Sequence, residues 1–160
     1  MARGTRQTLD AGQNAPDFRL ETIEGGTVSL NEILNSGPAL VAFYKVSCPT
    51  CQLTLPFLNR LKGSGVQVLT ISQNPADLAA EFNQEYGVDL PTLVDRAEDG
   101  YPASNAYGLS HVPAMFLVEP GGTITWSSVG FFRKDLEELG KRFGVEMFRP
   151  DDRVPNFKGG

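Results

Sequence analysis

An apolar run followed at once by a helical pattern constrains the fold of this chain most. The stretch PALVAFYKV, residues 38–46, is rich in strand-forming residues and follows a Gly-Pro breaker, which is typical of a strand buried on both faces. From Pro49 onward the apolar residues recur at helical spacing, and this pattern ends at Gly63. Because strands covered on both faces occur in sheets flanked by helices, we expect an α/β protein.

The rest of the chain continues the succession of strands and helices. A hairpin is predicted around the turn at residues 24–26, and Ser29 with Glu32 has the spacing of a capping box that opens a brief helix. Asn74 is expected to cap a helix that begins at Pro75. The remaining predicted elements are strands at 66–71, 90–95, 114–119 and 123–128, and helices at about 75–86, 101–108 and 133–144. This order predicts a mixed sheet with helices on both faces.

Length and charge limit the classes of function. With 160 residues, 41% of them hydrophobic and 21% charged, the chain is long enough for one domain with a core and too short for two. Residues 15–149 are expected to form this domain, between a flexible N-terminus at 1–14 and a tail at 150–160 that lies on the surface or frays. A net charge of −5 without a basic cluster argues against a nucleic acid as partner.

The opening residues and the apolar runs predict the cellular location of the protein and whether it spans a membrane. The chain starts with a basic and then polar stretch that lacks the apolar run of a signal peptide, so we expect a cytoplasmic protein. A periplasmic or exported protein is the alternative if a signal peptide was removed. The longest apolar stretches, ALVAFY and AMFLV, are much shorter than a membrane span, and no span is expected.

Two cysteines, Cys48 and Cys51, stand three positions apart at the predicted junction of strand and helix. A zinc site needs about four ligands, and the chain offers this pair and one histidine, His111. Unpaired N–H groups and the dipole at a helix N-terminus stabilise a thiolate, lowering a thiol pKa from ~8.5 into the range ~3.5–7.5. Residues three apart share a helix face, so the two sulfurs can reach each other. The position therefore favours a redox-active pair over a zinc site or inert thiols.

Three segments resemble the thioredoxin superfamily. FYKVSCPTCQLTLPFL is similar to its active-site segment, with Pro56 eight residues after the first cysteine, and AYGLSHVPAMFLVEPGGTI is similar to the segment around its cis-proline. Gly130 matches the glycine after the following hairpin. The start, APDFRLETIEGGTVSLNEI, resembles the hairpin of the redoxin branch, which contains TlpA/ResA-like thiol-disulfide oxidoreductases and AhpC/TSA peroxiredoxins. The resemblance implies a thioredoxin-like fold with an N-terminal β-hairpin and a central α/β insertion at 71–111.

The resemblance also implies roles for residues near the cysteines. Pro113 corresponds to the cis-proline of the family, and the backbone of the preceding residue, Val112, is expected to pair with a substrate chain beside the reactive cysteine. The dipeptide inside the motif, Pro49 and Thr50, is expected to contact substrate and to tune the reduction potential.

This chain departs from the patterns of its relatives at several positions. Ala42 stands where thioredoxins keep a buried acid, and Ser47 where TlpA-like proteins usually have tryptophan. Peroxiredoxins carry Pro-x-x-x-Thr-x-x-Cys, whereas this chain has Val41 and Lys45 at the proline and threonine positions, which argues against a peroxidatic site. Lys45 could instead help to stabilise a Cys48 thiolate.

The favoured function is thiol-disulfide exchange, in which a Cys48 thiolate attacks a substrate disulfide and Cys51 resolves the intermediate. One alternative is a peroxiredoxin-like peroxidase, in which Cys48 forms a sulfenic acid that condenses with Cys51. The other is a redox-inactive adaptor that binds peptides around Val112 and Pro113. No metal or other cofactor is needed, because two thiols carry two electrons. Protein disulfides and a thiol reductant system are the expected partners of a monomer.

Overall fold

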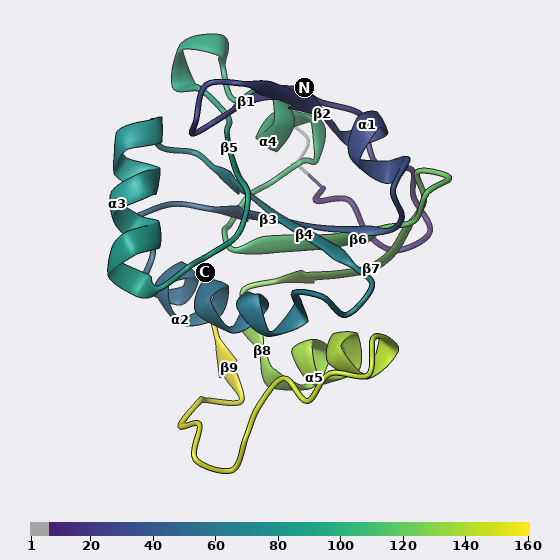
Figure 1. Ribbon diagram of the computed structural model, residues 1–160, viewed down its shortest axis with the longest axis vertical. Coiled ribbons are helices and arrows are strands. Elements are labelled where there is room, and N and C mark those ends of the chain that lie inside the picture. Colours follow the sequence, from purple (N-terminus) through teal and green to yellow (C-terminus); the bar gives the residue numbers. More distant parts are fainter. Residues whose placement is uncertain (1–6) are drawn as a thin grey trace, which may run out of the picture.

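A seven-stranded mixed sheet organises the protein, whose computed structural model describes residues 7–160 (Figure 1). The strand order is β2-β1-β5-β4-β3-β6-β7, and a separate two-stranded sheet pairs β8 with β9. The strands are β1 Arg19–Thr22, β2 Thr27–Ser29, β3 Ala39–Tyr44, β4 Gln67–Ser72, β5 Thr92–Val94, β6 Ala114–Val118, β7 Ile124–Val129, β8 Phe131–Phe132 and β9 Phe157–Lys158.

Five α-helices and two short 3-10 helices, in the described part of the chain, connect these strands. They are α1 Leu30–Leu34, α2 Pro49–Leu58, η1 Asn59–Leu61, α3 Ala76–Tyr86, η2 Ala97–Asp99, α4 Pro102–Ala106 and α5 Arg133–Arg142. None of the helices in residues 7–160 has the length and apolar character needed to cross a membrane.

The apolar run at 38–46 forms β3, the predicted buried strand. All six of its residues are buried, and the strand pairs in parallel with β4 and antiparallel with β6. Neighbouring residues of β3 point to opposite faces of the sheet. Phe43 packs on Tyr107, which follows α4, with ring centroids 5.2 Å apart, whereas Tyr44 packs on Phe82 of α3 at 4.8 Å. These contacts confirm the prediction of helices on both faces.

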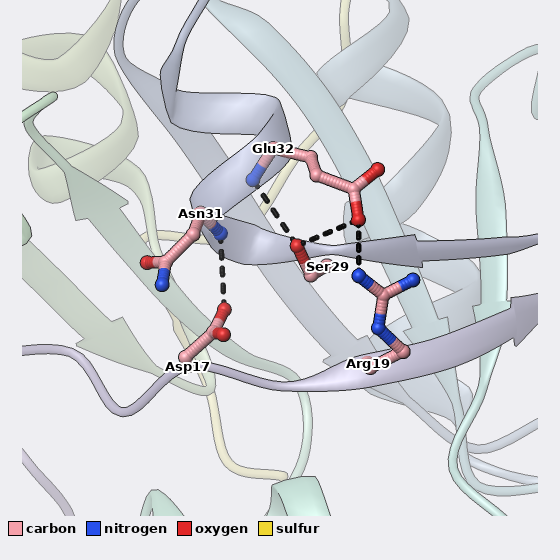
Figure 2. A network of polar contacts seen from close by, with 5 residues as sticks. All are labelled: Asp17, Arg19, Ser29, Asn31 and Glu32. Atoms are coloured by element: carbon pink, nitrogen blue, oxygen red, sulfur yellow. Dashed lines mark hydrogen bonds and ion pairs between the residues drawn. The ribbon is translucent and has the colours of Figure 1, made fainter.

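The N-terminal hairpin and its short helix also form as predicted (Figure 2). Ser29 is the N-cap of α1, and its hydroxyl oxygen accepts a hydrogen bond from the backbone N–H of Glu32 at 3.1 Å. The same hydroxyl donates to Glu32 Oε1, which also forms an ion pair with Arg19 of β1 at 2.5 Å. From the residues before β1, Asp17 accepts the backbone N–H of Asn31. The hairpin is therefore tied to the first turn of α1 by side chains.

Two details of the sequence-based prediction differ from the structure. The helix expected from Pro75 begins at Ala76, with Pro75 in the N-cap position, and Asn74 does not cap it. The amide oxygen of Asn74 instead accepts the backbone N–H of Val46, at 2.9 Å, in the loop before Cys48. This interaction joins two segments far apart in the sequence, so local helix-capping rules do not reveal it.

The ends of the chain pack against the domain more than their composition suggests. Residues 1–6 of the predicted flexible N-terminus lie outside the described residues. Leu9 and Gly12 donate backbone hydrogen bonds to Tyr107 and Ile124. At the other end, residues 157–158 do not fray but pair with β8 as β9 (Figure 1).

Candidate active site

The loop between β3 and α2 places Cys48 at the N-terminus of a helix. Cys48 is the N-cap residue of α2, and its sulfur accepts a hydrogen bond from the backbone N–H of Cys51 at 3.2 Å. The backbone of Val46 is held on both sides, since Asn74 accepts its N–H and the side chain of Gln52 donates to its carbonyl at 3.0 Å. Pro49 occupies the first helical position, where a missing N–H costs nothing. The local sequence therefore fixes the position of the Cys48 sulfur.

The two thiols have opposite environments. Cys48 is partly exposed, whereas Cys51 is fully buried, and both are free thiols. A hydrogen bond from the Cys51 thiol, supported by the N–H groups of the first turn and by the charge of Lys45, lowers the pKa of Cys48 to about 6. Burial, and the hydrogen bond given to Cys48, raise the pKa of Cys51 far above its usual range. At neutral pH Cys48 is thus mainly a thiolate and Cys51 a thiol.

The residue before the cis-proline lies against this thiolate. The Val112–Pro113 peptide bond is cis, as the resemblance implied. The sulfur of Cys48 is 3.5 Å from the carbonyl oxygen of Val112. On the other side of this loop, Pro113 accepts a backbone hydrogen bond from Gly130 at 2.8 Å. Three segments that are distant in the sequence, at Cys48, Val112 and Gly130, therefore meet at one place.

The dipeptide inside the motif is divided between surface and interior. Pro49 is exposed beside the cysteines, but Thr50 is only 2% exposed. The hydroxyl of Thr50 donates to the carbonyl oxygen of Gly159 at 2.5 Å. Sequence reasoning missed this partner, because no short motif marks residues 157–160 as part of the site.

The side chains of Lys45 and His111 line a hollow beside Val112. Lys45, at the end of β3, is exposed and lines this hollow of about 220 Å³ together with His111. His111 is also exposed, and its Nδ1 atom lies 3.0 Å from the hydroxyl oxygen of Ser110. Neither side chain has a hydrogen bond to Cys48, so Lys45 acts on the thiolate through its charge.

The residues present do not suggest a metal centre. Within residues 7–160, there is no group of three or more His, Cys, Asp or Glu side chains placed to hold a metal ion. Ala42, which stands where thioredoxins have an acid, is fully buried in β3.

Fold and site together define a thioredoxin-like protein with a dithiol centre, in which a partly exposed cysteine at a helix N-terminus faces a cis-proline loop. Residues 11–127 match the model of the AhpC/TSA family, which is more than half of the chain. The chain belongs to the AhpC/TSA family.

The similar proteins indicate to which branch of this family the chain belongs. The thiol-disulfide oxidoreductase ResA of Halalkalibacterium halodurans is 28% identical over 151 residues, which cover 91% of this chain and 81% of the relative. A solved structure from Chlorobium tepidum, named for a thiol:disulfide interchange protein DsbE, has a TM-score of 0.71 and 26% identity, covering 84% of this chain and 96% of that one. The protein is a TlpA/ResA-like redoxin and a thiol-disulfide oxidoreductase, as its motifs predicted.

The fold is shared more widely. The thioredoxin domain of a thiol-disulfide oxidoreductase from Bacteroides vulgatus has a TM-score of 0.73 with 22% identity, and covers 85% of this chain and 99% of that one. Its likeness confirms the predicted thioredoxin-like fold.

Proposed function

We propose that the protein reduces or exchanges disulfides of protein substrates, with Cys48 as the attacking residue and Cys51 as the resolving residue. The Cys48 thiolate attacks one sulfur of a substrate disulfide, so that a Cys48–substrate bond forms and the other substrate sulfur leaves as a thiolate. Cys51 then loses its proton to solvent or to the departing thiolate and attacks the Cys48 sulfur. The second substrate thiolate leaves, and two electrons have moved from the dithiol to the substrate.

One observation carries the assignment of roles: the sulfur that is partly exposed is also the one whose pKa is lowered to about 6. A buried thiol such as Cys51 cannot meet a protein disulfide from outside. It can reach only the sulfur of Cys48, one helical turn away, and attacks it once that sulfur carries the substrate; this order prevents Cys51 from starting the reaction.

The positions of Val112 and Pro49 support this mechanism, whereas Thr50, which was also expected to contact substrate, is buried and donates its hydroxyl to Gly159. Val112 presents its backbone beside the Cys48 sulfur, and an extended substrate chain could pair with that backbone as an added strand. Pro49 is exposed next to Cys48. A thiol reductant must restore the dithiol after each turnover when the protein acts as a reductase. Its expected monomeric state and cytoplasmic location remain predictions.

Stopped-flow kinetics of the reduced protein with insulin disulfides, and separately with hydrogen peroxide, test this function. Fast exchange with insulin in the wild type, arrest at a mixed disulfide in Cys51→Ser and no reaction in Cys48→Ser support it. Peroxide consumption faster than that of free cysteine would favour the peroxidase instead, although Val41 and Lys45 replace the proline and threonine of a peroxidatic site. No reaction with either reagent would leave the adaptor.

A further inference from the structure

The last residues of the sequence lie against Thr50 of α2 and Val112, next to Cys48. We call the surface along Val112, where a substrate chain is proposed to bind, the substrate groove. Strand β9 pairs antiparallel with β8, with Phe131 opposite Lys158 and Phe132 opposite Phe157. The rings of Phe132 and Phe157 pack with centroids 4.8 Å apart. Figure 1 shows β9 beside β8, with the chain then running toward α2. We call residues 157–160 the tail segment.

Beyond β9 the tail segment contacts three parts of the site. The carbonyl oxygen of Gly159 accepts the hydroxyl of Thr50. Gly160 lies so close to Val112 that a methyl group on it would stand 2.0 Å from the carbonyl oxygen of Val112. A methyl group on Gly130 would stand 3.1 Å from the carbonyl oxygen of Lys158. The tail segment therefore lies against the first turn of α2, the cis-proline loop and the glycine after β7.

Val112 is the residue with which the proposed function pairs the substrate backbone. We propose that the tail segment is an internal occupant of the substrate groove, which a protein disulfide must displace before it reaches Cys48. This inference rests on the proposed function in one respect, namely that protein substrates bind along Val112. A small disulfide needs no such groove and reacts whether or not the tail segment is in place.

The sequence of the tail segment fits this role. Because Gly160 has no side chain, its backbone can approach the cis-proline loop more closely than any other residue would permit. The contacts that hold the segment are few: a two-residue ladder, one ring pair and one hydroxyl hydrogen bond. Such a segment can leave and return on the timescale of loop motion.

Two glycine variants provide a matched test. Gly160→Ala introduces the clash with Val112, whereas Gly159→Ala places its methyl group 3.6 Å from the ring of Phe157, an ordinary contact. Phe157→Ser removes the ring pair with Phe132 from a position away from the cysteines. Gly160→Ala and Phe157→Ser should release the tail segment, and Gly159→Ala should leave it bound.

Hydrogen–deuterium exchange of the peptide that covers 131–133 reports whether the tail segment is bound, since the amides of β8 and Arg133 face β9 and Asn156. We expect faster exchange of this peptide in both Phe157→Ser and Gly160→Ala, with wild-type behaviour in Gly159→Ala. Only protein molecules whose groove is free of the tail segment can bind a protein substrate, so the apparent affinity falls in proportion to the fraction of such molecules. Both releasing variants should therefore raise kcat/KM for insulin by about tenfold. Their rates with 2-hydroxyethyl disulfide should remain within about twofold of wild type.

Each other outcome overturns a definite part of the proposal. Unchanged hydrogen exchange in Gly160→Ala would show that the tail segment does not lie on Val112. Released tail segments with unchanged insulin kinetics would show that it does not block substrates. Absence of thiol-disulfide exchange in every variant would contradict the proposed function, while the exchange of β8 amides would still report on the tail segment. A variant that no longer reacts with 2-hydroxyethyl disulfide is misfolded, and the other releasing variant then tests whether the tail segment blocks substrates.

Discussion

The sulfur of Cys48 accepts a hydrogen bond from the backbone N–H of Cys51 at 3.2 Å. One helical turn therefore holds the sulfur that we propose attacks the substrate and also carries the thiol that we propose resolves the mixed disulfide. Because the same turn buries Cys51 completely, the two thiols differ in exposure as well as in pKa. In the proposed function, this difference sets the order of the reaction.

The pH dependence of Cys48 alkylation should follow a low pKa. In the reduced protein, the rate with iodoacetamide should rise with pH and reach half its maximum at about pH 6, because the Cys51 hydrogen bond and the helix N-terminus stabilise the thiolate. Cys51→Ala should move this midpoint upward, since it removes the thiol donor and keeps the backbone one. A wild-type midpoint near that of a free cysteine, ~8.5, would contradict the assignment.

The reduction potential should change its slope with pH at the pKa of Cys48. Below about pH 6 both thiols of the reduced form are protonated, so two protons accompany two electrons and the potential should fall by ~59 mV per pH unit. Above that pH only Cys51 carries a proton, and the slope should be ~30 mV per unit. Equilibration with dithiothreitol buffers across this range measures both slopes. A single slope of ~59 mV per pH unit throughout would show that Cys48 stays protonated and would contradict its low pKa.

Lys45 should make a small electrostatic contribution to the thiolate. Its side chain is exposed at the end of β3 and acts on Cys48 through charge alone. Lys45→Met should therefore raise the pKa of Cys48 by about half a unit, and high salt should remove the difference. Lys45→Arg, which keeps the charge, is the matched control. A large, salt-independent rise in Lys45→Met would indicate a direct contact between the two side chains.

Local sequence patterns were sufficient for most of the fold and for the two thiols. The apolar run of β3, the helical spacing after Pro49 and the turn around Gly25 depend on neighbours in the sequence, and all three features were predicted. Resemblance added the cis peptide bond at Pro113. The position of Cys48 at a helix N-terminus was also predicted, and the roles proposed for the two thiols were inferred from it.

Contacts between distant segments could not be predicted in this way. Asn74 is of a residue type that often caps helices. Its side chain instead accepts a hydrogen bond from the backbone N–H of Val46, because β3 and β4 end side by side. The tail is rich in polar and turn residues, so its pairing with β8 depends on a surface that exists only after folding. Burial of Thr50 has the same cause, since Gly159 covers it.

A buried carboxylate behind the hollow should be important for stability. Asp95 is fully buried and accepts hydrogen bonds from the backbone N–H groups of Ala103 and Ser104 and from the Ser104 hydroxyl, at 2.6 to 3.0 Å. Asp95→Asn turns one acceptor into a donor that faces these N–H groups, and should lower the free energy of unfolding by about 2–4 kcal/mol in urea titration. Ser104→Ala, which removes one donor, should cost about 1 kcal/mol. Equal losses in both variants would mean that the backbone donors contribute little.

Trapping of the mixed disulfide tests the central claim most directly. Reduced Cys51→Ala and Cys48→Ala proteins are mixed with a disulfide-containing protein, and peptide mass spectrometry locates the bond that forms. We expect a stable adduct through Cys48 in Cys51→Ala and no adduct in Cys48→Ala, because Cys51 is buried and its pKa is raised. If Cys48→Ala forms an adduct through Cys51 as fast as Cys51→Ala forms one through Cys48, the roles proposed for the two cysteines are contradicted.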